Sequence, residues 1–227
     1  MEVVLVAVRP NIVFDLDGTL VDSAPSLCKT GNYLLELLHR PPIDVKTYKT
    51  FIGKGMLKQV EQLLSYTGGI PHNDLKKQLV LFREYYGQNS LVETTVYIGV
   101  SEALQYLKSL PAQLAICTQK AQNPARTILS GLDLEQYFGG FTFGDTLLVM
   151  KPNPATVFHS IKDFDNGPLI YIGDSETDSI TAKNSNAFFL LFSGGYRNSP
   201  LAEIDHYATF ESHNEIPGLV DRILSEF

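Results

Sequence analysis

The chain has 227 residues, of which 44% are hydrophobic and 19% are charged, and its formal net charge is −7. This is the balance of a globular protein with a sizeable core, and the length favours one large domain or two small ones. The negative charge argues against nucleic acid or an anionic membrane surface as a partner. No apolar run approaches the ~20 residues of a membrane span, so we expect no membrane partner.

The two cysteines and the first eight residues both favour a cytoplasmic protein. Cys28 falls on an expected helix and Cys117 in an apolar run, so nothing supports a disulfide between them. Residues 1–8 are apolar, but they carry Glu2, lack a basic flank and are too short for a signal peptide. We interpret them as an additional strand or an ordered tail.

The first chemical signal follows a short apolar run at residues 12–14, which predicts a buried strand. Directly after it come Asp15, Leu16, Asp17, Gly18 and Thr19. Residues two apart in a strand point to the same side, so both acids can face one site. Open α/β sheets bind ligands at the carboxyl ends of their strands, and we place a candidate site there. An acidic turn after a strand is the simpler structural alternative.

Residues 23–94 show helical patterns and no convincing strand. Three apolar stripes have the spacing of helix faces, and they comprise Leu27, Leu34, Leu35 and Leu38, then Leu57, Val60, Leu63 and Leu64, then Leu75, Leu79 and Phe82. Proline and glycine clusters separate these stripes. The segment predicts a small helical domain inserted after the first strand, at residues 23–94. Its connections near residues 21–24 and 92–99 could act as hinges.

The remainder of the chain alternates strands with helices. Strand-like runs lie at residues 114–118, 141–143, 169–172 and 188–192, and helical patterns lie at 101–109, 125–129 and 155–164. Alternation of this kind is typical of parallel β-α units. We therefore predict an α/β core with a doubly wound, Rossmann-like parallel sheet, built from residues 1–22 and 95–227.

Further polar signals follow the later strands. The Thr118 hydroxyl and the next backbone N–H could hold a phosphate oxygen, and the proline after Lys151 restricts that lysine to an extended approach. Asp174 and Asp178 cluster oxygens of the kind that suits Mg²⁺. Taken singly, each residue also has a structural explanation. Thr118 could be a polar strand end and Lys151 an exposed lysine before a turn. Asp174 and Asp178 could be acids that the dipole of a helix N-terminus favours.

Taken together and in this order, the motifs resemble those of the haloacid dehalogenase superfamily of phosphohydrolases. The resemblance covers nearly the whole chain, and its four motifs fall on Asp15 with Asp17, on Thr118, on Lys151, and on Asp174 with Asp178. The helical insert is similar to the cap domain of that superfamily.

The resemblance implies a mechanism for phosphate monoesters. Asp15 would be the nucleophile and form an aspartyl-phosphate, while Asp17 would protonate the leaving oxygen and then activate water. Mg²⁺ would be held by Asp15, Asp174 and the backbone carbonyl of Asp17. Lys151 would offset the repulsion between the Asp15 carboxylate and the phosphate.

The remaining motif residues would support this centre. Asp178 would orient Lys151 or a metal-bound water, and Gly18 and Thr19 would shape the first loop. Thr118 and Gln119, together with Lys151, would bind the phosphate. The second aspartate of the first motif argues against the dehalogenase and phosphonate-hydrolase branches, which lack it.

Among relatives, the chain is most similar to phosphoglycolate phosphatases. The similarity rests on Gly53-Lys54-Gly55, Ile98-Gly99-Val100, Lys151-Pro152-Asn153-Pro154 and Gly194-Gly195-Tyr196. Gln119 replaces the usual asparagine, and Ile98 replaces a common proline. The loop of Gly53, Lys54 and Gly55 is the candidate specificity loop, although a simple turn between helices also fits it. Arg197 is a candidate for a substrate carboxylate or a surface residue.

Several alternatives stay open at this stage. Within enzymes they are a nucleotide or pyrophosphate phosphatase and a β-phosphoglucomutase-like phosphomutase, and outside enzymes a regulatory phosphate-binding protein on the same fold. The five histidines show no spacing of metal ligands. We expect a small phosphate as the partner, and a monomer or a homodimer as the assembly.

Overall fold

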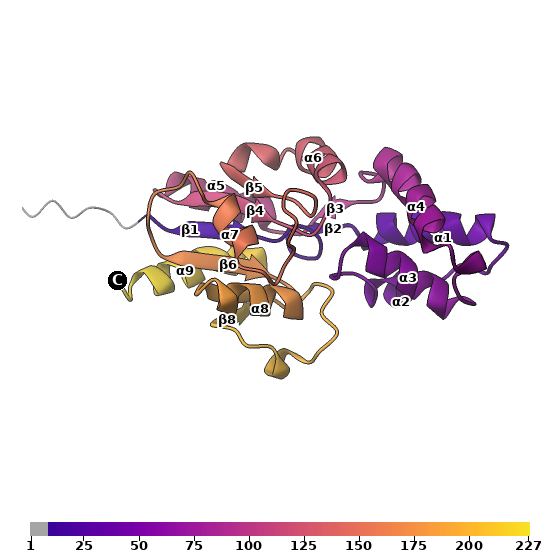
Figure 1. The fold of residues 1–227 in the computed structure, drawn as a ribbon. Coiled ribbons are helices and arrows are strands. Elements are labelled where there is room, and N and C mark those ends of the chain that lie inside the picture. Colours follow the sequence, from indigo (N-terminus) through magenta and orange to yellow (C-terminus); the bar gives the residue numbers. More distant parts are fainter. Residues whose placement is uncertain (1–8) are drawn as a thin grey trace, which may run out of the picture.

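The computed structural model describes residues 9–227, and a six-stranded parallel sheet forms its centre (Figure 1). The strands are β5 (Gly140–Thr142), β4 (Gln113–Cys117), β1 (Asn11–Phe14), β6 (Leu169–Gly173), β7 (Phe188–Phe192) and β8 (Ala208–Phe210), in that spatial order. Every neighbouring pair is parallel. The predicted α/β fold with a doubly wound parallel sheet is confirmed.

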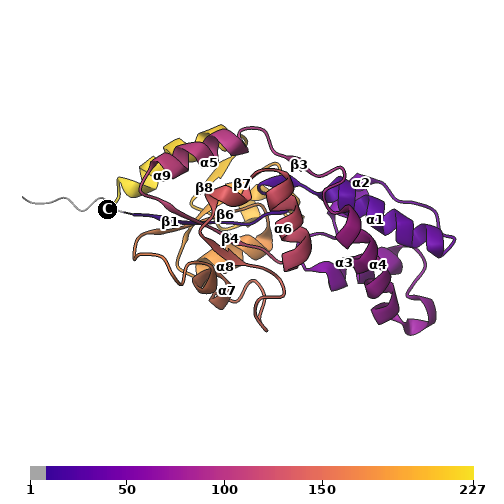
Figure 2. The same cartoon turned by 90° about the horizontal axis from the view of Figure 1, so that it is seen from above.

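Helices cover both faces of the sheet because successive strand residues point to opposite sides. On one face, Ile12 and Phe14 share a hydrophobic cluster with residues of α5 (Val100–Ser109), α6 (Gln122–Gly131) and α9 (Ile216–Leu224). On the other face, Val13 shares a cluster with residues of α7 (Ala155–Ser160) and α8 (Glu176–Asn184). Figure 2 shows α5 and α9 on one side of the strands and α7 and α8 on the other.

The helical insert lies beside one end of the sheet, at the right in Figures 1 and 2. It consists of α1 (Ala24–Leu37), α2 (Val45–Lys49), α3 (Met56–Tyr66), the 3₁₀ turn η1 (Pro71–Asn73) and α4 (Leu75–Asn89). These helices enclose a second hydrophobic cluster of their own. The two connecting segments pair as short antiparallel strands, β2 (Val21–Asp22) and β3 (Thr95–Val96).

Several elements differ from the sequence expectation. The helix expected at 155–164 ends at Ser160, where the Ser160 hydroxyl donates to the Val157 carbonyl and the chain enters a polar turn. The strand expected at 141–143 lies one residue earlier. The strands β2, β3 and β8 were not predicted, because two or three residues carry too little periodic signal. The expectation for residues 1–8 falls outside the described residues.

Two further observations bear on the nature of the chain. Cys28 and Cys117 are both buried free thiols, as the sequence predicted. Within residues 9–227, no helix combines the length and the apolar character that crossing a bilayer requires.

Candidate active site

The sheet order brings the predicted motif residues to one edge. Asp15 follows β1, Thr118 follows β4 and Asp174 follows β6, and β1 lies between β4 and β6. Lys151 reaches the same edge from the loop between β5 and α7. Residues that are up to 159 positions apart in the sequence therefore meet at the carboxyl ends of adjacent strands.

Three carboxylates form the centre of the site. Asp15, Asp174 and Asp178 each offer an oxygen, and these oxygens lie within 4.8 Å of one another. Close approach of the first loop depends on Gly18, whose φ is +85° and where a Cβ would lie 2.4 Å from Asp174 Oδ2. Thr19 donates its hydroxyl to Asp174 Oδ1 at 2.9 Å. Gly18 and Thr19, which were predicted to shape the first loop, therefore lie against the Asp174 carboxylate.

Asp178 is saturated by donors of the protein. Its Oδ1 accepts from Lys151 Nζ at 2.7 Å and from the Tyr171 hydroxyl at 3.1 Å. Its Oδ2 accepts from the Ser175 hydroxyl at 2.6 Å and from the backbone N–H groups of Ser175 and Asp174. Asp178 lies in the first turn of α8, where Ser175 and Asp178 form a capping box. This carboxylate is thus arranged to hold Lys151 rather than an additional ligand.

Lys151 is a buried cation between two acids. Its ammonium lies 2.7 Å from Asp178 and 3.1 Å from Asp15 Oδ1, and 3% of its side chain is exposed. Burial alone would lower the pKa of Lys151, but Asp15 and Asp178 outweigh it and raise that pKa. The lysine is therefore charged over the whole working range of pH.

Asp15 and Asp174 hold their protons more tightly than ordinary aspartates. Burial raises the pKa of Asp15 to about 7, although Lys151 opposes the rise. Burial, together with the charges of Asp178 and Asp15, raises the pKa of Asp174 well above its usual range. Two buried carboxylates facing each other are costly to ionise without a compensating cation.

A divalent cation fits this arrangement. A small cavity of about 30 Å³, close to the volume of one water, is lined by Asp15, Asp17 and Asp174 among others. The donor atoms at this point are oxygens, which suits a hard ion such as Mg²⁺. Asp15 Oδ1 accepts from the Leu16 N–H at 2.7 Å, whereas within the described chain no donor bonds Oδ2, so the two oxygens of Asp15 can serve different partners. Asp15, Asp17 and Asp174, the three residues predicted as ligands, all line this small cavity.

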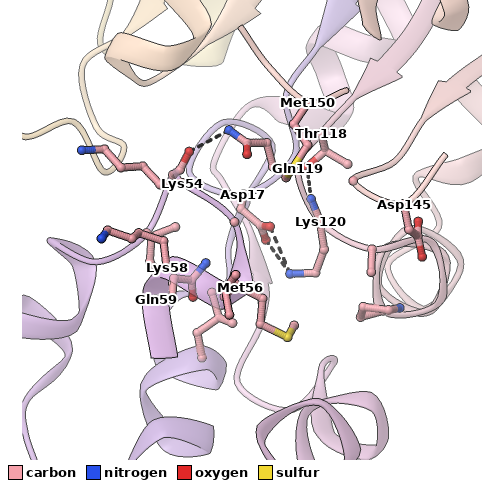
Figure 3. A pocket seen from close by; sticks show the side chains of 18 of the residues that line it. Asp17, Lys54, Met56, Lys58, Gln59, Thr118, Gln119, Lys120, Asp145 and Met150 are labelled. Atoms are coloured by element: carbon pink, nitrogen blue, oxygen red, sulfur yellow. Dashed lines mark hydrogen bonds and ion pairs between the residues drawn. The ribbon is translucent and has the colours of Figure 1, made fainter. Parts of the chain in front are cut away.

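Thr118 and Gln119 have different environments, although they were predicted as one phosphate-binding pair. Thr118 is buried beside the large cavity, and its hydroxyl oxygen accepts from the Lys120 N–H at 3.2 Å. The side chain of Gln119 turns to the helical insert and donates to the Gly53 carbonyl at 2.9 Å (Figure 3). A phosphate contact from Gln119 would therefore come from its backbone N–H.

Asp17 is held by a lysine that sequence reasoning did not single out. Lys120 Nζ donates to both oxygens of Asp17, at 2.8 and 3.1 Å (Figure 3). It also donates to the Tyr86 hydroxyl at 2.5 Å. The Ser23 hydroxyl also donates to Asp17 Oδ1. Burial would lower the pKa of Lys120, but Asp17 and Tyr86 raise it instead. Since Tyr86 belongs to α4, this cluster joins the sheet edge to the helical insert.

A cavity of about 610 Å³ opens between the sheet edge and the insert. Its insert wall includes the predicted loop of Gly53, Lys54 and Gly55. Lys54 is exposed, and it shares that wall with Met56, Lys58 and Gln59, which face the core residues in Figure 3. The loop thus lines the same cavity as Asp15 and Asp17. Arg197 lines neither cavity, and its guanidinium donates to the Ser193 carbonyl.

Sequence reasoning missed four residues of this site, namely Lys120, Tyr86, Tyr171 and Tyr196. Tyr86 and Tyr171 resemble ordinary core aromatics because each sits in a helical or strand pattern. Lys120 did carry a signal, since a lysine one residue beyond Gln119 begins a turn at the active edge. Tyr196 was noted as part of a glycine-rich motif, without its contacts.

Comparisons with known proteins agree with this geometry. A family model of haloacid dehalogenase-like hydrolases matches residues 12–192. A phosphoglycolate phosphatase of Rhodobacter capsulatus is 34% identical over 212 residues, which are 93% of this chain and 97% of that protein. One of Cereibacter sphaeroides is 34% identical over 219 residues, which are 95% of this chain and 100% of that protein.

A solved structure shares the fold across nearly the whole chain. It is described as a predicted phosphoglycolate phosphatase from Haemophilus somnus 129PT, with a TM-score of 0.87 and 26% identity. The match covers 93% of this chain and 98% of that one. The chain belongs to the haloacid dehalogenase-like hydrolase family. Within this family it is a phosphatase of the phosphoglycolate phosphatase-like type.

Proposed function

We propose that the chain is a Mg²⁺-dependent phosphomonoester hydrolase that forms an aspartyl-phosphate on Asp15 and acts on phosphoglycolate. In this proposal residues 23–94 are the cap domain, and residues 1–22 and 95–227 are the core domain. The observation that carries it is the meeting of Asp15, Lys151 and Asp174 in one buried cluster beside a cavity. The substrate is inferred from relatives that bear that name at 34% identity.

Asp15 is the nucleophile in this scheme. Its Oδ1 is engaged by the Leu16 N–H and by Lys151, so its Oδ2 is left to attack phosphorus. The bond from phosphorus to the ester oxygen breaks as the bond from Oδ2 to phosphorus forms. Lys151 keeps a positive charge beside the carboxylate and phosphate oxygens, and Asp178 fixes the position of that charge.

The predicted metal ligands are Asp15, Asp174 and the backbone carbonyl of Asp17. A bound Mg²⁺ would supply positive charge that offsets the phosphoryl oxygens and the two buried carboxylates. Thr19 and the Tyr196 N–H orient Asp174 by donating to its two oxygens, at 2.9 and 2.6 Å. Thr118 and the Gln119 backbone N–H would bind a phosphate oxygen at the opposite side.

Asp17 is the general acid and then the general base in this scheme. It lines both cavities two residues from Asp15, where it can reach the ester oxygen that leaves. Asp17 gives a proton to that oxygen and then takes one from the water that attacks the aspartyl-phosphate. The second attack releases phosphate and restores the Asp15 carboxylate. Because Lys120 and Ser23 hold Asp17 in this structure, the acid has to exchange those partners to serve the substrate.

The insert supplies the charge for a second anionic group. Phosphoglycolate carries a carboxylate beside its phosphate ester. Lys54, Lys58 and Arg83 line the insert wall of the large cavity, where Lys58 is paired with Glu61 at 2.6 Å. Lys54 and Arg83 can therefore offset the negative charge of such a group. The cytoplasmic location and the monomeric or homodimeric assembly stay predictions.

The test is a phosphate-release assay with phosphoglycolate, nucleotides, sugar phosphates and pyrophosphate, with Mg²⁺ and with a chelator. We expect Mg²⁺-dependent release with a preference for phosphoglycolate, and loss of turnover in Asp15→Asn. Asp165→Asn is the matched control, because Asp165 forms an exposed ion pair with Arg9. A different preferred substrate would keep the mechanism and replace phosphoglycolate. A tenth of wild-type turnover in Asp15→Asn would refute the nucleophile.

A further inference from the structure

Tyr196 belongs by sequence to the core, but its ring lies in the insert. It follows β7 in the glycine-rich loop at residues 194–196, and 4% of it is exposed. Its side chain is part of the same hydrophobic cluster as Ala24, Leu27 and Phe51 of the insert. A residue of the core loop is thereby buried among cap residues.

The two polar ends of Tyr196 bind different parts of the molecule. Its backbone N–H donates to Asp174 Oδ2 at 2.6 Å. Its hydroxyl donates to Asp22 Oδ1 at 2.7 Å and accepts from the N–H groups of Ser23 at 2.8 Å and Ala24 at 3.1 Å. One residue thus contacts the carboxylate cluster and the connection between β2 and α1.

The hydroxyl of Tyr196 accepts the N–H of Ala24, the first residue of α1, at 3.1 Å, and Asp22 Oδ1 accepts the same N–H at 3.2 Å. The first N–H groups of a helix lack partners within the helix and need an acceptor from elsewhere. Ser23 occupies the N-cap position, but its side chain makes no capping bond and donates to Asp17 instead. The N-terminus of the first cap helix is therefore held by a core side chain.

The surroundings make this link stiff. Gly195 packs so tightly on Asp174 that a Cβ at residue 195 would lie 2.2 Å from Asp174 Cβ. On the other side, Lys49 of α2 lies 3.3 Å from Asp22 Oδ2 and 5.1 Å from the centre of the Tyr196 ring. Because these groups are in close contact, a displacement of Asp174 would also displace the hinge residues 22–24.

We propose that Tyr196 is a positioning residue that couples Asp174 to the hinge of the cap. The inference rests on the proposed function, because it takes Asp174 as a ligand of Mg²⁺. Ion binding that fixes Asp174 would also fix residues 22–24, through the Tyr196 backbone and hydroxyl. The site would then control the position of the cap before substrate is turned over.

The test measures amide hydrogen exchange with and without Mg²⁺ in the wild type and in Tyr196→Phe. The variant keeps the ring and the N–H to Asp174 and loses the hydroxyl alone. In the wild type, Mg²⁺ should slow exchange of the amides of Ser23, Ala24 and Tyr196 by about threefold or more. In Tyr196→Phe, Mg²⁺ should still slow exchange of the amide of residue 196. It should no longer slow exchange of the amides of Ser23 and Ala24. The Mg²⁺ concentration for half-saturation should stay within about twofold, while turnover falls about tenfold.

The matched control is Tyr106→Phe. The Tyr106 hydroxyl, on α5, donates to Asp221 of α9 at 3.1 Å and contacts neither the hinge nor the carboxylate cluster, so its removal should leave all three amides and turnover unchanged. If the hinge amides of Tyr196→Phe keep their response to Mg²⁺, or those of the wild type have none, the coupling is wrong. If the Tyr196 amide of the wild type ignores Mg²⁺ as well, the assignment of Asp174 as a ligand fails first.

Discussion

The large cavity has a core wall, formed by residues of the sheet edge, and a cap wall, formed by residues of the helical insert. The charged side chains of these two walls differ in burial and in pairing. On the core side, Lys151 and Asp178 are 3% and 0% exposed and lie 2.7 Å apart, and Asp17 is paired with Lys120 at 2.8 Å. On the cap wall, Lys54 and Arg83 are exposed, and neither forms an ion pair within the described residues. Buried charges must be paired in fixed geometry, whereas exposed ones are solvated and free to move. The core wall is therefore set before substrate arrives, and the cap wall adapts to it.

The largest expected effect comes from breaking the core wall at Asp178. Asp178→Asn removes the charge that faces Lys151 and places an amide N–H against donors of the α8 N-terminus. Leaving a buried cation underpaired costs about 3–5 kcal/mol, and turnover should fall about a hundredfold or more. Urea unfolding and phosphate release measure the two effects. A stability loss below about 1 kcal/mol, the size expected for the exposed Asp165→Asn, would contradict this view of the core wall.

A smaller effect is expected from Lys54→Ala on the cap wall. Loss of an exposed cation should change the free energy of unfolding by less than about 1 kcal/mol. It should lower kcat/KM by about threefold to tenfold for substrates that carry a second anionic group besides the phosphate. The ranking of substrates should therefore change, while the Mg²⁺ requirement should not. Phosphate release across the substrate panel gives both quantities. Exposed Lys76→Ala on α4 is the control, and an unchanged ranking in Lys54→Ala would remove the 53–55 loop from the site.

The smallest expected effect is on the pH dependence of stability and concerns His213, which packs against the first loop at Thr19. Its ring is 1% exposed, and its Nε2 lies 2.7 Å from the Thr19 carbonyl. Burial lowers the pKa of His213 from its usual value of 6.5. As the pH falls through 6.5, the unfolded chain therefore takes up a proton before the folded one, and stability is lost.

Thermal or urea unfolding at pH 7.5 and 5.5 can isolate the contribution of His213. The wild type should lose more stability over this range than His213→Gln does. His72→Gln, at an exposed position of η1, should follow the wild type. Equal pH dependence in the wild type and His213→Gln would show that His213 does not titrate as its burial implies.

The core wall could be predicted from the sequence because each residue is placed locally. Asp15 and Asp174 directly follow apolar strands, and a parallel sheet brings strand ends together whatever the loops do. Asp178 follows at the spacing of a first helical turn. The position of these residues at one edge of the sheet was therefore predictable from short segments.

The contacts between core and cap could not be predicted in this way. Tyr196 and Asp22 are 174 residues apart, and Lys120 and Tyr86 are 34 apart, so no local pattern relates them. The direction of the Gln119 side chain likewise depends on where the Gly53 carbonyl lies in space. Such contacts follow from how two packed units meet, which hydrophobic periodicity does not encode.

The short pairing of β2 with β3 keeps the two ends of the helical insert together, which bears on how such an insert is accommodated in the fold. Val21 lies opposite Val96, and Asp22 opposite Thr95, so both ends of the 72-residue insert at positions 23–94 leave and rejoin the core at neighbouring points. An insertion with adjacent ends adds little closure entropy to the host, since that cost grows with the logarithm of loop length. The sheet and the helices can then collapse as separate nuclei. Recombination at the β2–β3 pair would exchange one helical insert for another without disturbing the order of the six strands.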